Sequence, residues 1–172
     1  FWFKILTKDH FVIMGRKTWE SIPEKHRPLV DRVNVIIGKC NGTTIVGALT
    51  DSPVVYVESF ESALQWCAQA VKNRSYSCRR CMVIGGASVY RQALMSPWLR
   101  TGLVTRFDID YGCDLKFPTE LLAGAKCERD RTFVSNRILN QYYEYDFTNT
   151  DERLYQDLVR RLIADPVRPN RT

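Results

Sequence analysis

The sequence has no apolar run long enough to cross a membrane and no secretory signal pattern. These two absences favour a soluble protein, which we expect in the cytoplasm. Internal repeats and low-complexity tracts are also absent, so the chain shows no sign of a repeat architecture or of a compositionally biased segment. Histidine is scarce, because only His10 and His26 occur.

The pattern for a zinc site is incomplete. Cys78 and Cys81 have the spacing of half such a site, but no second pair of this kind follows and the two histidines lie far away in sequence. A redox motif would need a thioredoxin-like context, which is missing. We therefore expect no metal, and free thiols in a reducing compartment. The cysteines are Cys40, Cys67, Cys78, Cys81, Cys113 and Cys127.

Length and charge narrow the class of protein further. A chain of 172 residues with 45% hydrophobic residues can form one good core with a small appendage. The net charge of +6 is compatible with nucleic-acid binding, but the basic residues are scattered rather than clustered. A solvated surface with a site for anionic small molecules fits better, and we expect neither nucleic acid nor a membrane as partner.

The stretch HFVIMGRKTWESIP, at residues 10–23, predicts a buried strand that leads at once into a helix. Residues 12–14 are apolar without polar alternation, as in a strand covered on both faces, and Gly15 lets the backbone turn closely. Arg16 and Lys17 add positive charge where the helix N-terminus would present free N–H groups. This arrangement is typical of an anion site, and phosphate suits it.

The stretch CMVIGGASVY, at residues 81–90, repeats the pattern. Residues 82–84 predict a strand, Gly85 and Gly86 a turn, and residues 87–95 a helix. Two such turns could hold one dinucleotide. The same pattern also occurs where the glycines serve only close packing of helix on strand, so the motif alone leaves both interpretations open.

The remaining pattern alternates strands with helices. Strands are predicted at residues 33–37, 54–57, 103–109 and 138–147, the last of them near an edge, and residues 41–53 are rich in turn formers. Ser59 can cap a helix whose buried face would carry Ala63, Leu64, Cys67 and Val71. We expect an α/β fold with a mainly parallel sheet and helices on both faces.

The stretch GRKTWESIPEKHRPLVDRVNVIIGK, at residues 15–39, strongly resembles dihydrofolate reductase, and VIGGASVY, at residues 83–90, resembles the second signature of that family. The likeness runs, with gaps, from Phe1 to about Phe147. It implies a dihydrofolate-reductase-like fold whose C-terminal edge is antiparallel. It also implies the NADPH-dependent reduction of 7,8-dihydrofolate to tetrahydrofolate, with dihydrofolate and antifolates as ligands.

The resemblance implies two groups of cofactor-binding residues. Gly15, Arg16, Lys17 and Thr18 approach the phosphates, while Gly85, Gly86, Ala87, Ser88 and Val89 line the other side of the pyrophosphate. In the family the Gly-Gly peptide is cis. A Ser-Arg or Thr-Arg pair usually selects the 2′-phosphate, whereas this chain has Gly38 and Lys39 there. A lysine keeps the charge but lacks the planar fork of arginine, and NADPH stays the expected cofactor.

The resemblance also implies a substrate site. Phe3 matches the aromatic contact to the aminobenzoyl ring, and Arg32 matches the arginine that pairs with the α-carboxylate of the glutamate tail. The alternative for Arg32 is a surface arginine in a turn. The remaining substrate residues are Ser21, Ile22 and Leu29 on the wall, Ile84 through its carbonyl to the pterin amino group, and Tyr90 near the nicotinamide.

The catalytic acid is not assigned to any residue, because the resemblance places it upstream of Phe1. Asp9 and Asp31 fall in turns that the resemblance places away from the pterin. Leu115 stands where the family commonly has a threonine bonded to that acid. We expect a polypeptide limited to these 172 residues to be inactive.

Residues 149–172 follow a predicted reductase domain at residues 1–148, which would be incomplete at its N-terminus. Thr150 or Asp151 can cap an amphipathic helix that could simply dock on this domain. However, ERLYQDLVRRLIADPVRPNRT resembles the start of thymidylate synthase, where Arg171 would hold the phosphate of dUMP. This order implies a bifunctional enzyme of the protozoan and plant type. Its synthase part would make dTMP with methylenetetrahydrofolate and would form a homodimer.

Two other functions remain open. A relative with the same fold could reduce a ribosylated pyrimidine, although Arg32 and Phe3 argue against it. A non-catalytic nucleotide-binding or scaffolding domain could keep the glycine turns and use the terminal helix for assembly.

Overall fold

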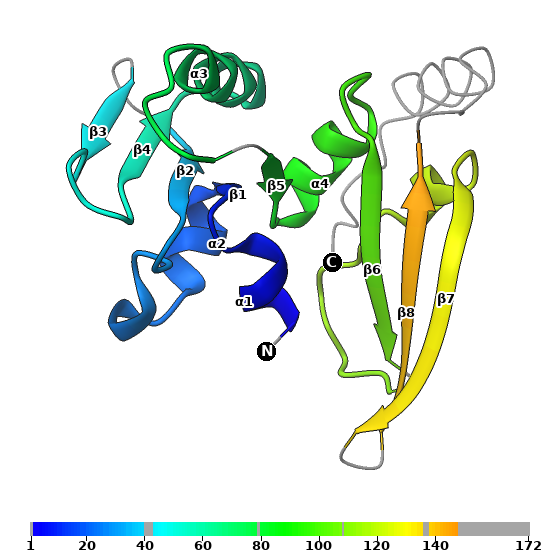
Figure 1. The fold of residues 1–172 in the computed structure, drawn as a ribbon. Coiled ribbons are helices and arrows are strands. Elements are labelled where there is room, and N and C mark those ends of the chain that lie inside the picture. The colour runs from blue at the N-terminus through cyan, green and yellow to red at the C-terminus, as the bar shows by residue number, and fades with distance from the viewer. Residues whose placement is uncertain (1, 40–42, 79, 108, 136–137, 148–172) are drawn as a thin grey trace, which may run out of the picture. The chain divides into compact units, whose positions relative to one another are not determined.

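Figure 1 shows the computed structural model, which describes residues 2–39, 43–78, 80–107, 109–135 and 138–147. The chain divides into two compact units, Phe1–Gln92 and Ala93–Thr172, and each is described by itself. The helix predicted after Thr150 lies outside the described residues, and so does Arg171, the predicted ligand of the dUMP phosphate. The division into domains at residue 148 stays a prediction. No helix in the described part of the chain is long and apolar enough to cross a membrane.

The first unit contains a five-stranded sheet in the order β3-β4-β2-β1-β5 (Figure 1). Four strands are parallel, and each was predicted from an apolar run: β1 (Phe11–Gly15), β2 (Val33–Ile37), β4 (Val54–Val57) and β5 (Cys81–Val83). The edge strand β3 (Thr44–Val46) was not predicted and pairs antiparallel with β4. Its three residues are exposed, so no burial pattern marks it in the sequence.

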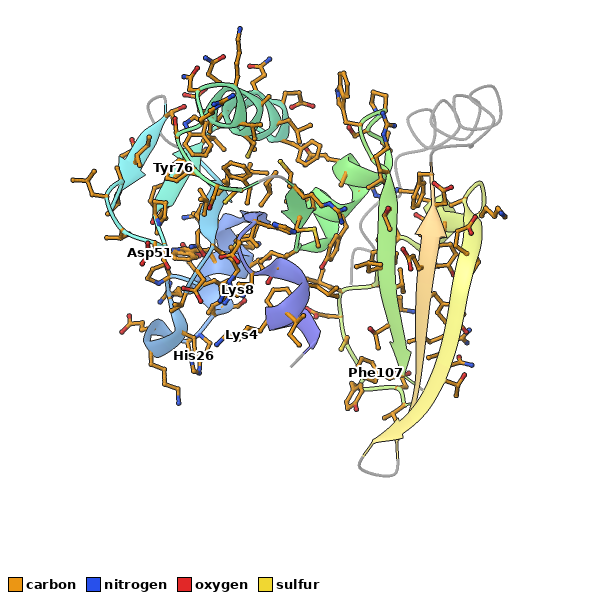
Figure 2. The ribbon with its side chains drawn as sticks, in the orientation of Figure 1. Lys4, Lys8, His26, Asp51, Tyr76 and Phe107 are labelled. Carbon is orange, nitrogen blue, oxygen red and sulfur yellow. The ribbon has the colours of Figure 1, made fainter. Side chains whose placement is uncertain are left out.

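Helix α3 (Phe60–Lys72) covers one face of this sheet. The Phe11 ring of β1 meets the Trp66 ring of α3 edge-on, with centroids 6.0 Å apart. Phe11 also meets Tyr76, labelled in Figure 2, at 6.3 Å. These aromatic contacts place the odd-numbered side chains of β1 under the helix, which leaves its even-numbered side chains for the opposite face.

The N-terminus of α3 is as predicted, but its buried face is turned slightly. The Ser59 hydroxyl accepts a hydrogen bond from the Ser62 N–H at 3.0 Å, which satisfies one free donor of the first turn. The prediction of Val71 as a buried residue is wrong, because it is 44% exposed. Ala70 takes its place, since it continues the spacing of the buried residues Phe60, Ala63 and Cys67.

The second unit contains a three-stranded antiparallel sheet in the order β6-β8-β7. Its strands are β6 (Thr101–Phe107), β7 (Lys126–Ser135) and β8 (Ile138–Asp146). The sequence pattern places β8 near an edge, but it is the middle strand of this sheet, because β7 pairs with its other side. Strand β7 was not predicted, since its sequence KCERDRTFVS is largely polar. The separate core contains Leu94, Leu121 and Phe147, with Leu121 from η2 (Thr119–Leu122).

The five described cysteines are free. Cys67 and Cys78 are buried as expected for free thiols, whereas Cys81, Cys113 and Cys127 are exposed. The interaction of the Cys67 thiol of α3 with the Cys81 thiol at the start of β5 lowers the pKa of Cys81, and partial desolvation of the Cys81 sulfur opposes this effect. The same interaction raises the pKa of Cys67.

Ile13→Val tests the central position of β1. Ile13 is fully buried, so the loss of one methylene should lower the free energy of unfolding by about 0.5–1.5 kcal/mol. Urea unfolding followed by tryptophan fluorescence measures this difference. The matched control is Ile45→Val on the exposed strand β3, which should change the free energy by less than about 0.5 kcal/mol. Equal effects at the two positions would contradict this account of the core.

Cys67→Ala tests the thiol pair. The loss of the donor should raise the pKa of Cys81, which lowers its thiolate fraction at neutral pH and moves the pH profile of its alkylation to higher pH. The rate of modification of Cys81 by iodoacetamide, followed by mass spectrometry, measures this shift. Cys67→Ser keeps a hydroxyl donor and should stay close to the parent profile. An unchanged profile in Cys67→Ala would show that Cys67 does not stabilise the thiolate.

Candidate functional site

The two glycine turns meet at the carboxyl ends of β1 and β5. The Gly15 N–H donates to the Gly85 carbonyl at 2.8 Å, and the Ile84 N–H donates to the Ile13 carbonyl at 2.9 Å. The peptide between Gly85 and Gly86 is cis, as the family resemblance implies. The structure therefore brings together two motifs that lie about 70 residues apart in the sequence.

An added side chain would be tightly packed at all three glycines of these turns. Gly85 has φ +115°, and an added Cβ would lie 3.2 Å from the Tyr90 ring. A Cβ on Gly15 would lie 3.3 Å from Cγ2 of Val89. Gly86 differs, because a Cβ there would meet only the hydroxyl of Thr18 at 3.2 Å. The positive φ and the Tyr90 ring thus explain Gly85, whereas at Gly15 and Gly86 an added Cβ would meet one side-chain atom each at 3.2–3.3 Å.

A helix begins at each turn. Helix α2 (Arg16–Ser21) follows Gly15 directly, without a side-chain cap. In α4 (Ala87–Leu94) the Val89 and Tyr90 N–H groups donate to the Gly86 carbonyl. Among the described residues, no hydrogen bond is made by the N–H groups of Ala87 and Ser88, so they stay available to an anion.

Basic side chains surround the same edge of the sheet. Arg16 is exposed, with an ion pair of 3.7 Å to Glu20, and Lys17 is exposed as well. Gly38 follows β2, and a Cβ there would lie 3.3 Å from Cβ of Arg16, so the predicted residues Gly38 and Arg16 are in contact. Lys39 is exposed beside them in sequence. Backbone N–H groups, the Thr18 hydroxyl and cationic side chains form a donor set that suits a diphosphate.

An apolar cluster lies on the face of the sheet opposite α3. Its buried members are Val12, Met14, Ile36 and Val54. Three predicted substrate residues from separate segments, Ile22, Leu29 and Ile84, pack against it. Trp19 is partly buried and also packs there. The structure thus brings Ile22, Leu29 and Ile84 against one apolar cluster, whereas Ser21 is exposed and its hydroxyl donates to the Thr18 carbonyl at 2.7 Å.

Arg32 is buried, only 6% exposed, so it is not a surface arginine. Its Nε donates to the Val30 carbonyl at 2.9 Å and its Nη1 to the Thr7 hydroxyl at 3.0 Å. The Thr7 hydroxyl in turn donates to the Phe3 carbonyl at 2.7 Å. These bonds connect Arg32 to α1 (Trp2–Thr7), which carries Phe3 with 48% of its surface exposed.

The charge of Arg32 has no ion-pair partner among the described residues. Burial lowers the pKa of Arg32, and the neighbouring Asp31 carboxylate partly opposes this. Asp31 itself pairs with Lys8 at 3.8 Å, and Figure 2 labels Lys8 next to α1. The third nitrogen of the guanidinium, Nη2, makes no hydrogen bond to a described residue. Every buried side-chain nitrogen in the described part of the chain has a hydrogen-bond partner, so Nη2 is accessible to solvent. Buried charges are normally paired, and Arg32 can therefore receive an anion.

The structure also places the remaining residues named from the sequence. Tyr90 lies against Gly85, and burial raises its pKa. Asp9 and Asp31 have φ of 59° and 60°, which confirms that both lie in turns. Leu115 is 72% exposed in the second unit. Sequence reasoning missed Thr7 and Asn34, although a single polar residue inside the apolar run VNVII was a signal for Asn34.

Comparison with known proteins shows the family of this chain. The dihydrofolate reductase family model matches residues 1–150. The chain belongs to the dihydrofolate reductase family. The dihydrofolate reductase of Candida albicans is 33% identical over 144 residues, which cover 80% of this chain and 69% of that protein.

Two plant relatives are longer proteins. Bifunctional dihydrofolate reductase-thymidylate synthase 2 of Arabidopsis thaliana is 41% identical over 112 residues, 65% of this chain but 19% of the relative. The bifunctional dihydrofolate reductase-thymidylate synthase of Daucus carota is 39% identical over 136 residues, 79% of this chain and 22% of the relative. The match therefore spans about a fifth of these bifunctional proteins.

Dihydrofolate reductases use NADPH, and the residues present fit this cofactor. The N–H groups of Ala87 and Ser88, the Thr18 hydroxyl and the side chains of Arg16 and Lys17 would hold its phosphates. A side chain at Gly86 would intrude beside Thr18, where the backbone is otherwise open to a ligand.

Gly85→Ala and Gly86→Ala test the glycine turn as a pair. Gly85→Ala places a side chain at positive φ and against the Tyr90 ring, so it should lower the free energy of unfolding by about 1–3 kcal/mol and weaken NADPH binding. Gly86→Ala should cost less stability, because only the Thr18 hydroxyl must move, and should act mainly on NADPH binding. Urea unfolding and fluorescence titration with NADPH separate the two effects. A larger loss of stability in Gly86→Ala would contradict the assignment.

Proposed function

We propose that the protein to which this chain belongs binds NADPH at the two glycine turns and reduces 7,8-dihydrofolate to tetrahydrofolate. The observation that carries the proposal is Arg32, a buried guanidinium anchored by two hydrogen bonds and without an ion-pair partner among the described residues. A planar guanidinium in this state suits a carboxylate, such as the α-carboxylate of the glutamate tail of a folate. Membership of the dihydrofolate reductase family supports the same substrate.

Different residues would bind the two ligands, NADPH and dihydrofolate. When bound, NADPH supplies the hydride. Ile22, Leu29 and Ile84, which pack against the buried cluster and are only partly buried themselves, would contact the substrate and keep water away from it. Phe3, exposed on α1, would contact the aminobenzoyl ring, while the Ile84 carbonyl would accept a hydrogen bond from the pterin amino group.

The proton that the reduced nitrogen needs is not assigned to a residue of this chain. Asp31 is engaged in an ion pair with Lys8, and Asp9 is exposed in a turn. Neither carboxylate belongs to the apolar cluster formed around Val12 and Met14. The proposal therefore covers cofactor binding, substrate binding and hydride transfer.

Arg32 also separates the alternatives. Neither a pyrimidine reductase nor a nucleotide-binding scaffold needs a buried arginine that is held ready for the carboxylate of a glutamate tail. Binding of NADPH without binding of an antifolate would favour the scaffold.

We further propose that the chain belongs to a bifunctional protein that also makes dTMP from dUMP with methylenetetrahydrofolate. The names of the plant relatives and the likeness of residues 152–172 to the start of thymidylate synthase support this. Arg171 would then bind the dUMP phosphate, and the synthase part would form a homodimer in the cytoplasm.

Arg32→Lys tests the substrate assignment. The change removes the planar fork, so the affinity for a folate or a glutamate-bearing antifolate should fall by about 1.5–3 kcal/mol, or roughly 10- to 150-fold. NADPH binding should not change. Fluorescence titration with each ligand gives the two affinities, and the loss of NADPH absorbance on addition of dihydrofolate to the full-length protein gives the activity.

The matched control is Arg27→Lys, because Arg27 lies in the same segment but stacks over Trp19 at 5.6 Å. It should leave the folate affinity within about threefold of the parent, as expected of a change away from the ligand. A full-length protein that binds NADPH but neither binds the antifolate nor oxidises NADPH with dihydrofolate would overturn the proposed function.

A further inference from the structure

We propose that Asn34 is a positioning residue for Arg32, and that it acts by fixing the backbone of residues 29–32, here called the 29–32 loop. The inference rests on the proposed function, since it presumes that Arg32 receives a substrate carboxylate. Asn34 itself would touch neither substrate nor cofactor. It would decide where the guanidinium is held.

Asn34 is an unusual residue for its position. It lies within β2, between its partners Val12 of β1 and Val54 of β4, and is fully buried. Asparagine is depleted in strands, and a buried amide is costly unless it is hydrogen-bonded. Its neighbours on this face, Val12, Ile36 and Val54, are all apolar. A valine or leucine would suit such a site better if packing were its only task.

The Asn34 side-chain amide makes three of its hydrogen bonds to the 29–32 loop. Oδ1 accepts from the Leu29 N–H at 3.0 Å, while Nδ2 donates to the Leu29 carbonyl at 3.2 Å and to the Arg32 carbonyl at 3.0 Å. A more distant contact of 3.5 Å joins Nδ2 to the Pro53 carbonyl. The partners fix the orientation, because an N–H can only donate and a carbonyl can only accept. The same side chain thus holds both ends of the loop.

The position of the loop sets the position of the guanidinium. Arg32 Nε donates to the Val30 carbonyl, which is part of the loop, so a shift of the loop moves this anchor and the arginine backbone together. The turn contains Asp31 at φ 60°, and its N–H donates to the Ser52 hydroxyl at 2.9 Å. Of the two bonds that the Arg32 guanidinium makes to described residues, the one from Nη1 to Thr7 reaches outside the loop. Without Asn34, the two ends of the loop would lose three of their hydrogen bonds.

A positioning role makes a prediction that a purely structural role does not. If Asn34 only stabilised the fold, its loss would weaken all ligands alike. If it positions Arg32, its loss should reduce the part of the affinity that depends on the ligand's α-carboxylate. Two dissociation constants measure this part: one for a glutamate-bearing antifolate and one for the same compound with its α-carboxylate converted to the amide. The ratio used below is the dissociation constant of the amide divided by that of the carboxylate.

The experiment compares Asn34→Leu and Asn34→Asp with the parent protein. Leucine has a similar volume and makes none of the bonds, while aspartate keeps the acceptor for the Leu29 N–H and loses both donors. The parent ratio should be large, and both variants should lower it by roughly tenfold or more, because small misplacements of a binding group are costly. NADPH affinity should stay unchanged. Ile36→Val is the matched control on the same strand and face, and it should leave the ratio unchanged.

The possible results separate the role of Arg32 from the role of Asn34. A parent ratio near one would refute the role of Arg32 and with it the proposed function. A large parent ratio that both Asn34 variants retain would overturn the positioning role and leave the proposed function standing. If the variants do not fold, amide exchange in the parent protein decides, because the Leu29 N–H should be protected by its bond to Asn34. Rapid exchange of Leu29 in the folded protein would overturn the proposal.

Discussion

Strand β1 is the constraint on which the first unit depends, because it is hydrogen-bonded along both edges and buried on both faces. Its neighbours β2 and β5 are parallel to it, and Phe11, Val12, Ile13 and Met14 are fully buried. Parallel strands that run together also end together, so the turns after β1, β2 and β5 lie at one edge of the sheet. The contact between Gly15 and Gly85 follows from this register, and with it the place where two helices begin.

The two faces of that sheet have different tasks. The face with Phe11 packs under α3 through aromatic contacts and contributes stability. The opposite face, with Val12 and Met14, gathers Ile22, Leu29 and Ile84, which are the residues proposed to meet the substrate. Asn34 on this face donates to the Arg32 carbonyl, and the buried charge of Arg32, which is costly without an ion-pair partner, would gain one when a carboxylate binds. The folded protein thus holds the Arg32 charge in place for a carboxylate, at a cost in the free energy of unfolding.

The parts of the fold that the sequence predicted are those with a strong burial pattern. The four parallel strands are largely apolar runs, and Ser59 is an ordinary helix cap, so local chemistry was sufficient. The missed elements lack such a pattern: β3 is short and exposed, and β7 is polar. Strand β8 was found, but its middle position was not, because that depended on the unrecognised partner β7. For α3, a rotation of one residue exchanged Val71 for Ala70 in the buried face.

By itself the sequence determined the family, the glycine turns and the identity of most candidate site residues, because these are carried by short contiguous motifs. Only the tertiary structure decided that Arg32 is buried, that Ile22, Leu29 and Ile84 share one surface, and that Thr7 and Asn34 hold the arginine. The physical reason is that burial and hydrogen bonding join groups far apart along the chain. The bond from Arg32 to Thr7 spans 25 residues, and no local pattern specifies its partner.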